Sequence, residues 1–351
     1  MAYTFQTAAE ISGIQEGFNL TTNMHHTDIS QGQLGNCWVI AAVSAVAEHN
    51  AVTGDNQDIE QLFLDPIYTP GQPVPVQLYD NSGNGVVLYV PDSFPVDEQG
   101  MPCYATPKTS EDAWVMFLEA AFAMLYSGST TELSFDSYQL LVGGPPARAL
   151  LNITGPHVYD ELCFEPSTGA WVVVSGTVYD DRRGQGEVEA EHVWHMIADA
   201  ARDGEVLCCG TGGVEMVGQD NAATNGVAET HAYSITDVVE HEVGRLIYMR
   251  NPWGQNDQLL EQLQSMGAFV GEDGIIGMYW EQFLERFDYI SIVNYIRGCS
   301  CLECTPAPCH DVGAGQDVQQ EQQEQDGNCV DGCDNGCDGL DQQFNECVQV
   351  Y

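Results

Sequence analysis

The segment that most constrains this chain is an apolar helix that begins at a cysteine. A glycine-rich turn, Gln31–Asn36, leads into Cys37 and Trp38, and Val39–Ala47 is almost entirely apolar. A helix without a polar face is normally buried, so this one is predicted to lie inside a domain and to point its N-terminus outward. The helix dipole and the unpaired N–H groups there favour a thiolate, which makes Cys37 a candidate nucleophile. A buried structural thiol is the alternative.

Length and hydropathy limit the class of protein. The chain has 351 residues, of which 44% are hydrophobic, enough for two globular domains with separate cores. Its apolar runs are shorter than the roughly 18–20 residues that span a bilayer. The first residues lack the basic and apolar regions of a secretory signal. We therefore expect a cytoplasmic protein that does not insert into membranes.

The charge is extreme, with 52 acidic residues against 9 basic ones and a net charge of −43. Lys108 is the only lysine. Such an acidic chain is not expected to bind nucleic acid, which requires a basic surface. Molar salt shortens the Debye length to about 3 Å and would remove most of the self-repulsion. The composition therefore predicts a halophilic source, with divalent cations as the other possible neutraliser.

A second strong helix is predicted over Glu111–Tyr126, with Ser110 as its N-cap. Its body is apolar except for Glu119. A carboxylate is rarely buried unless it is paired, so either a metal cation binds Glu119 or this residue lies on an exposed edge of the helix. The following break, Gly143–Pro146, is predicted to be a hinge between two halves.

Beyond the hinge the sequence predicts mostly antiparallel β-structure, giving an α+β fold overall. One amphipathic helix is expected over Val188–Ala201, ended by Gly204. Segments with alternating or β-branched residues are predicted to be strands: Trp171–Tyr179, Val206–Cys209, His231–Val239, Arg245–Arg250, Gly277–Trp280 and Tyr289–Val293.

Two of these strands carry the groups that a thiol nucleophile needs. Acyl transfer by a thiol requires a base, and the base requires an orienting partner. His231 enters one strand and Asn251 ends the next, so the two side chains can face each other if the strands form a hairpin. The Asn251 oxygen could then accept from the imidazole N–H and fix its tautomer. Trp253 could cover this hydrogen bond.

Taken together, these blocks resemble the calpain family of cysteine proteases. Gln-Gly-x-Leu-Gly-Asn-Cys-Trp at 31–38 is similar to the family's nucleophile motif. His-Ala-Tyr-Ser-Ile at 231–235 and Arg-Asn-Pro-Trp-Gly at 250–254 are similar to its histidine and asparagine blocks, in the same order. The resemblance covers roughly residues 25–297. It implies a papain-like fold, with a mainly helical first subdomain, an antiparallel β second subdomain and the active-site cleft between them.

The domain organisation follows from this resemblance. We expect an N-terminal arm over residues 1–24, a nucleophile subdomain over 25–144 and a histidine and asparagine subdomain over 145–297. An acidic, cysteine-rich tail is expected over 298–351.

The resemblance also implies roles for single residues. Cys37 would be the nucleophile, His231 the general base and Asn251 its orienting partner. Gln31 would donate to the oxyanion together with the Cys37 backbone N–H, and Trp253 would shield the site. The implied activity is endopeptidase cleavage of a protein or peptide substrate through a thioester. A thiol acyltransferase or amidase, and an inactive binding module, are the alternatives.

Calcium is the cofactor that the resemblance implies. Asp28 and Glu119 align with the carboxylates of the calcium site in the first subdomain. Asp257 and Asp273 fall near the matching positions in the second subdomain, but Ile275 stands where a ligand carboxylate is expected. Thr230 occupies a position that is usually glycine in the family, and we expect it to narrow the approach to His231.

The tail contains eight cysteines, beginning at Cys299. They could form up to four disulfides or bind zinc, and without an export signal we favour the metal. The spacing predicts a zinc site made by Cys301, Cys304, Cys309 and His310. The partner of this tail is unknown.

Overall fold

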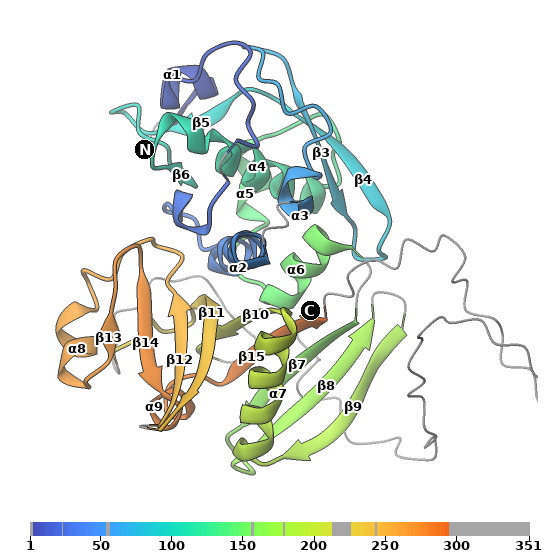
Figure 1. Ribbon diagram of the computed structural model, residues 1–351. Coiled ribbons are helices and arrows are strands. Elements are labelled where there is room, and N and C mark those ends of the chain that lie inside the picture. Colours follow the sequence, from blue (N-terminus) through green and yellow to red (C-terminus); the bar gives the residue numbers. More distant parts are fainter. Residues whose placement is uncertain are drawn as a thin grey trace, which may run out of the picture. The chain divides into compact units, whose positions relative to one another are not determined.

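The computed structural model describes residues 3–22, 24–53, 57–155, 158–177, 180–212, 226–242 and 244–294. Helices and short strand pairs make up the N-terminal half, residues 3–155, and a large sheet dominates the C-terminal half, residues 158–294 (Figure 1). The predicted tail lies outside the described residues, as do the zinc candidates Cys301, Cys304, Cys309 and His310.

The N-terminal half holds six α-helices and two 3₁₀ turns among its described residues. These are α1 (Ala8–Ser12), α2 (Cys37–Thr53), α3 (Gln57–Glu60), α4 (Trp114–Ser127), α5 (Phe135–Gln139) and α6 (Pro146–Thr154), with η1 (His26–Asp28) and η2 (Ser110–Ala113). Its strands pair two by two: β1 (Thr4–Gln6) with β5 (Phe94–Val96), β2 (Ile29–Ser30) with β6 (Thr106–Pro107), and β3 (Val74–Tyr79) with β4 (Gly85–Val90).

The C-terminal half folds as one sheet in which all described pairs are antiparallel. The strand order is β13-β14-β12-β11-β10-β15-β7-β8-β9. The strands are β7 (Val158–Glu165), β8 (Ala170–Thr177), β9 (Asp180–Val188), β10 (Val206–Gly210), β11 (Ala232–His241), β12 (Gly244–Arg250), β13 (Phe269–Val270), β14 (Ile275–Tyr279) and β15 (Tyr289–Asn294). Helices α7 (Ala190–Asp203), α8 (Leu260–Ser265) and α9 (Trp280–Leu284) accompany them.

Helix α2 lies where the two halves meet. Its residues from Cys37 to Ala47 are all buried, which confirms the prediction from its apolar sequence. It packs against α6 and against β10 and β11 (Figure 1). Because β11 follows His231 directly, this packing brings the cysteine helix and the histidine strand into one interface.

The sheet separates two hydrophobic clusters. In β10, Val206 and Cys208 join the cluster around α2 and α4, whereas Leu207 and Cys209 join the cluster around α7. Successive residues of a strand point to opposite faces, so this alternation means that β10 is covered on both sides. Buried strands of this kind have an almost continuous apolar sequence, as β10 does.

The helix around Glu119 differs from its prediction at its N-terminus. Thr109, not Ser110, is the capping residue: its hydroxyl accepts from the Glu111 N–H at 3.2 Å, and its own N–H donates to Asp112 Oδ2 at 2.7 Å. This reciprocal capping box closes η2, and α4 continues from it. Because Asp112 accepts the hydrogen bond from the Thr109 N–H, Thr109 is the capping residue and Ser110 is the first residue of the turn.

Candidate active site

The turn before Cys37 is packed against backbone. A Cβ on Gly32 would lie 2.6 Å from the Cys103 carbonyl oxygen and even closer to that of Tyr104. Gln33 donates its N–H to the Cys103 carbonyl at 2.9 Å. Only glycine permits this approach of two backbones, which explains why a glycine follows Gln31.

A buried carboxylate also holds this turn. Glu119 in α4 accepts from Asn36 Nδ2 at 2.7 Å and from the Ala105 N–H at 2.9 Å. Burial raises the pKa of Glu119 to about 7, and these two hydrogen bonds oppose the shift. The partners of this carboxylate are therefore neutral N–H donors, one of which is the residue immediately before Cys37. The sequence alone predicts no role for Asn36.

The backbone of His231 is fixed by Thr211, which follows β10. The His231 N–H donates to Thr211 Oγ1 at 3.1 Å, and the His231 carbonyl accepts from the Thr211 N–H at 3.0 Å. Thr230, the preceding residue, has a φ of 49°. A β-branched residue in this left-handed region is strained, and the strain lies beside the histidine. No motif in the sequence predicts the Thr211 contact.

The side chains of His231 and Asn251 meet as predicted, with His231 Nε2 and Asn251 Oδ1 3.1 Å apart. The other contacts of Asn251 assign the orientation of its amide. Its Nδ2 lies 3.4 Å from the Gln255 carbonyl and 3.3 Å from Asn256 Oδ1, and its Oδ1 also accepts from the Trp253 N–H at 3.0 Å. Because Oδ1 can only accept, the neutral imidazole carries its proton on Nε2 and leaves Nδ1 as a base.

Aromatic rings surround this hydrogen bond. The Trp253 ring centroid lies 4.7 Å from that of His231, and the Tyr233 ring contacts the imidazole edge-on at 5.0 Å. Burial lowers the pKa of His231 to about 4, although the hydrogen bond to Asn251 opposes this shift. The imidazole is therefore neutral at pH 7 and able to accept a proton.

Hydrogen bonding joins the two sides of the site. The Gln31 N–H donates to the Pro252 carbonyl at 2.8 Å, so the turn before Cys37 is bonded to the residue after Asn251. Next to this bond, a Cβ on Gly254, which has a φ of 70°, would lie 2.5 Å from Ser30 Oγ. The chain can make this close approach between the halves because residue 254 is glycine.

The side chain of Gln31 is only partly bonded. Its Nε2 donates to the Leu34 carbonyl at 2.6 Å. Its Oε1 is buried and has no hydrogen-bond partner among the described residues. An amide nitrogen has two hydrogens, so one N–H of Gln31 remains for another acceptor.

The calcium candidates Asp28 and Glu119 act as hydrogen-bond acceptors. Asp28 Oδ2 accepts from the His25 N–H at 2.7 Å and closes η1, and burial raises the pKa of Asp28 to about 6. Within the described ranges, no three or more His, Cys, Asp or Glu side chains are grouped so as to hold a metal ion. The carboxylates near the nucleophile turn are thus not a converged ligand set, and calcium binding there stays a prediction.

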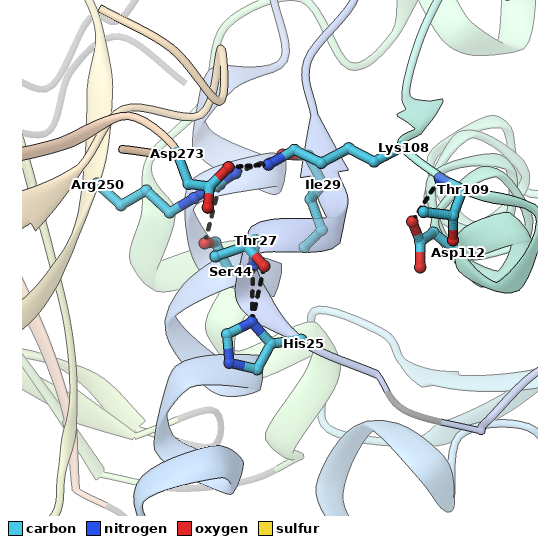
Figure 2. Close-up of polar contacts among 9 residues, drawn as sticks. All are labelled: His25, Thr27, Ile29, Ser44, Lys108, Thr109, Asp112, Arg250 and Asp273. Atoms are coloured by element: carbon cyan, nitrogen blue, oxygen red, sulfur yellow. Dashed lines mark hydrogen bonds and ion pairs between the residues drawn. The ribbon is translucent and has the colours of Figure 1, made fainter. Parts of the chain in front are cut away.

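The second pair of candidates differs in its surroundings. Asp257 is exposed, and its backbone N–H donates to Gln255 Oε1 at 2.7 Å. Asp273, which has a φ of 54°, accepts a hydrogen bond from Lys108 of the N-terminal half (Figure 2). This contact lowers the pKa of Asp273. A lysine therefore neutralises Asp273 where calcium was predicted.

Arg250 belongs to the asparagine motif, but the motif predicts no role for it. Its side chain is completely buried and reaches α2 at Ser44, the one polar residue within the apolar run Val39–Ala47. A lone serine in an otherwise apolar helix was the available signal for this contact.

None of the helices within the described ranges has the length and apolar character needed to cross a membrane.

Comparison with known proteins gives a consistent result. The profile of the family described as "Calpain family cysteine protease" matches residues 4–294. The chain is 25% identical over 301 residues to calpain-type cysteine protease ADL1 of Oryza sativa subsp. japonica, a match that covers 81% of this chain. It is 25% identical over 233 residues to human calpain-14 and 23% identical over 292 residues to mouse calpain-5, covering 65% and 74% of this chain.

These relatives are much longer proteins. The matches span 12% of the rice protein, 28% of human calpain-14 and 41% of mouse calpain-5. The similarity therefore concerns one region of each relative.

Proposed function

Since this chain belongs to the calpain family of cysteine proteases, we propose that it is a cysteine endopeptidase that cleaves proteins or peptides through a thioester at Cys37. The observation that carries this proposal is the hydrogen bond between His231 Nε2 and Asn251 Oδ1. An inactive binding module would have no need for an asparagine held so that only its oxygen faces the imidazole.

The reaction would use the imidazole twice. His231 Nδ1 takes the proton from the Cys37 thiol, and the sulfur attacks the carbonyl carbon of the scissile peptide bond. His231 then gives this proton to the leaving amine, and the thioester remains on Cys37. A water molecule, deprotonated by the same nitrogen, hydrolyses the thioester and restores the thiol.

Burial keeps the His231 imidazole neutral, which is the protonation state that an initial base requires. An imidazole with a pKa of about 4 is neutral at pH 7. Asn251 holds the tautomer with the proton on Nε2, which directs the lone pair of Nδ1 away from this bond. Once a proton arrives, Asn251 Oδ1 stabilises the imidazolium by accepting from Nε2.

Gln31 and the Cys37 backbone N–H are the proposed oxyanion donors. The remaining N–H of Gln31 Nε2 would bond the oxygen of the tetrahedral intermediate, as the bond to Leu34 leaves one hydrogen available. The bond between the Gln31 N–H and Pro252 keeps this residue beside the asparagine turn. Loss of one such donor typically lowers the rate by about 10²–10³-fold.

A labelling experiment tests this function. The full chain is treated with an electrophilic peptide and, separately, with casein, each with calcium or chelator and in low or molar salt. We expect label on Cys37 and casein cleavage, both abolished by Cys37→Ala. Cys103→Ala is the matched control, because Cys103 is another buried thiol of the N-terminal half and burial raises its pKa.

The outcomes separate the functional classes. Absence of Cys37-dependent labelling under every condition would overturn the peptidase in favour of a binding module. Labelling without hydrolysis, but with transfer of the acyl group to an added amine, would favour an acyltransferase. Activity that requires calcium would support the predicted calcium dependence, and equal activity in chelator would reject it.

We also propose that the chain works in concentrated salt, because its net charge is −43. Screening at molar salt would relieve the repulsion among its carboxylates. Thermal unfolding across a salt series tests this: full stability in dilute, chelated buffer would reject it.

A further inference from the structure

Arg250 is a buried cation at the junction of the two halves. It ends β12, and its side chain is 0% exposed. Its Nη2 donates to the Ile29 carbonyl at 2.6 Å, and its Nη1 donates to Ser44 Oγ at 3.2 Å. Figure 2 shows the guanidinium reaching from β12 towards these two residues.

One acceptor lies just before the proposed oxyanion donor in the chain, and the other lies in the helix that carries the proposed nucleophile. Ile29 lies in β2, two residues before Gln31, and Ser44 lies in α2, seven residues after Cys37. Residues seven apart share a face of a helix, so Ser44 lies two turns below the thiol on the same side. The backbone of Arg250, in turn, leads directly into Asn251. One side chain therefore connects the strand before Gln31, the Cys37 helix and the Asn251 turn.

Packing alone does not explain a buried arginine at this position, because burying its charge costs free energy. Arg250 Nε has no hydrogen-bond partner among the described residues, and none of the ion pairs described for the chain involves Arg250. Asp273, Asp28 and Glu48 favour its charge only through longer-range attraction. An apolar side chain of similar volume often fills a buried position at lower cost than a charge. Unlike an apolar side chain, the planar guanidinium donates two directed hydrogen bonds at once, here to two separate elements.

We propose that Arg250 is a positioning residue that sets the placement of Gln31 and Cys37 relative to His231 and Asn251, through its hydrogen bonds to Ile29 and Ser44. This inference rests on the proposed peptidase function. The bond from Gln31 N–H to Pro252 joins the same segments, but it fixes only the backbone beside Asn251. Arg250 fixes α2 as well, and α2 determines where the thiol lies.

The test compares Arg250→Lys, Arg250→Met and Ser44→Ala with wild type, using kcat per active site counted by Cys37 labelling. Arg250→Lys keeps the positive charge but lacks the planar pair of donors that bonds Ile29 and Ser44 at the same time. A misplacement of about 1 Å can lower the rate 10²-fold. We expect kcat to fall roughly 10–100-fold in Arg250→Lys, further in Arg250→Met and about 3–10-fold in Ser44→Ala, with KM changed less than about threefold.

Arg245→Met is the matched control, because Arg245 begins the same strand region but pairs with Glu191 and Glu240 at the surface. Its kcat should stay within about twofold of wild type. If the Arg250 and Ser44 variants match this control in kcat per active site, the positioning role is overturned, whatever their stability. If wild type itself shows no Cys37-dependent activity, the proposed function fails first, and this inference fails with it.

Should Arg250→Met and Arg250→Lys not fold, Ser44→Ala decides the result, since it deletes only a hydroxyl from α2. Its expected signature is a lower kcat per active site in a folded variant whose midpoint of thermal unfolding falls only modestly, because Arg250 Nη1 loses one buried acceptor. Unchanged kcat in a folded Ser44→Ala would then overturn the proposal.

Discussion

Two amide side chains on opposite sides of the candidate site differ in how they are held. Asn251, in the C-terminal half, uses its oxygen for His231 and the Trp253 N–H, and its nitrogen for Gln255 and Asn256. Among the residues that the structure describes, Gln31 in the N-terminal half makes one side-chain hydrogen bond, to Leu34, and its buried oxygen has no partner.

The difference matches what each amide is proposed to do. Asn251 must keep one imidazole tautomer throughout the reaction, so its orientation is fixed in advance by the protein. Gln31 must bind charge that exists only in the transition state, so part of its hydrogen-bonding capacity stays unused until then. The unpaired oxygen is an energetic cost accepted at that position. The two residues should therefore respond differently to the same truncation.

Removing Asn251 should have the largest effect. Asn251→Ala leaves the His231 Nε2–H and the Trp253 N–H without their acceptor and frees the imidazole tautomer. We expect kcat/KM to fall about 10²–10⁴-fold, and the free energy of unfolding to fall by roughly 1–3 kcal/mol per buried group left unpaired. Peptide hydrolysis and urea unfolding of the same preparation measure both.

Asn152→Ala is the matched control for Asn251. Asn152 is also buried and bonded on both sides of its amide, to the Tyr79 carbonyl and the Tyr126 hydroxyl, but it lies in α6. Its loss should lower stability without changing kcat per active site. Equal catalytic losses in the two variants would refute the special role given to the Asn251 orientation.

Gln31→Ala should separate catalysis from stability. The variant loses a proposed oxyanion donor, so kcat should fall about 10²–10³-fold. It also loses one hydrogen bond, worth about 1 kcal/mol, while removing a buried unpaired oxygen of similar cost. The free energy of unfolding should therefore stay nearly constant. A stability loss as large as that of Asn251→Ala would show that Gln31 is a structural amide, and the contrast would disappear.

His231 in the C-terminal half and Glu119 in the N-terminal half should change the free energy of unfolding in opposite directions as the pH rises. His231 has a pKa lowered by burial to about 4 from an ordinary 6.5. The unfolded chain therefore binds more protons between these values, and the contribution of His231 to stability is complete above pH 6.5 and is lost as the pH falls towards 4. The size of this contribution is on the order of 3 kcal/mol.

Glu119 gives the reverse slope in the N-terminal half. Burial raises its pKa to about 7 from 4.5, so its contribution is complete below pH 4.5 and is lost as the pH rises to 7. Unfolding of wild type, His231→Gln and Glu119→Gln from pH 4 to 7.5 checks both signs. The difference between wild type and His231→Gln should grow with pH, and that between wild type and Glu119→Gln should shrink. Parallel curves would contradict the buried environments of these two groups.

The sequence could predict the second side of the site because its signals are local. His231 immediately precedes β11 and Asn251 immediately follows β12, and the pairing of Ser234 with Arg250 in this hairpin brings them together. Period-two alternation, together with the motif order, was sufficient to expect this contact. Burial of the helix that begins at Cys37 could be predicted equally well, because a helix without a polar face is normally buried.

The partners of buried polar groups could not be predicted in this way. Glu119 was expected to need a metal or solvent, yet the structure gives it the Asn36 amide and the Ala105 backbone N–H. Backbone donors carry no residue-specific signal, so a sequence cannot show which N–H will face a carboxylate. Ser44 and Arg250 lie 206 residues apart in the chain, and only the packing of α2 on the sheet brings them together.

The smallest expected effect concerns the surface link between the same two sides. Lys108 and Asp273 are 31% and 44% exposed, unlike the buried Arg250 nearby. An exposed ion pair contributes about 0–1 kcal/mol and is screened by salt. Lys108→Gln should therefore lower the free energy of unfolding slightly in dilute buffer and not at all in molar salt. Arg202→Gln, which removes an equal charge but an ion pair within α7 alone, is the control. If Lys108→Gln instead lowers the free energy of unfolding by more than the control, and does so in molar salt as well, the contact between Lys108 and Asp273 would hold the two halves together as Arg250 is proposed to do.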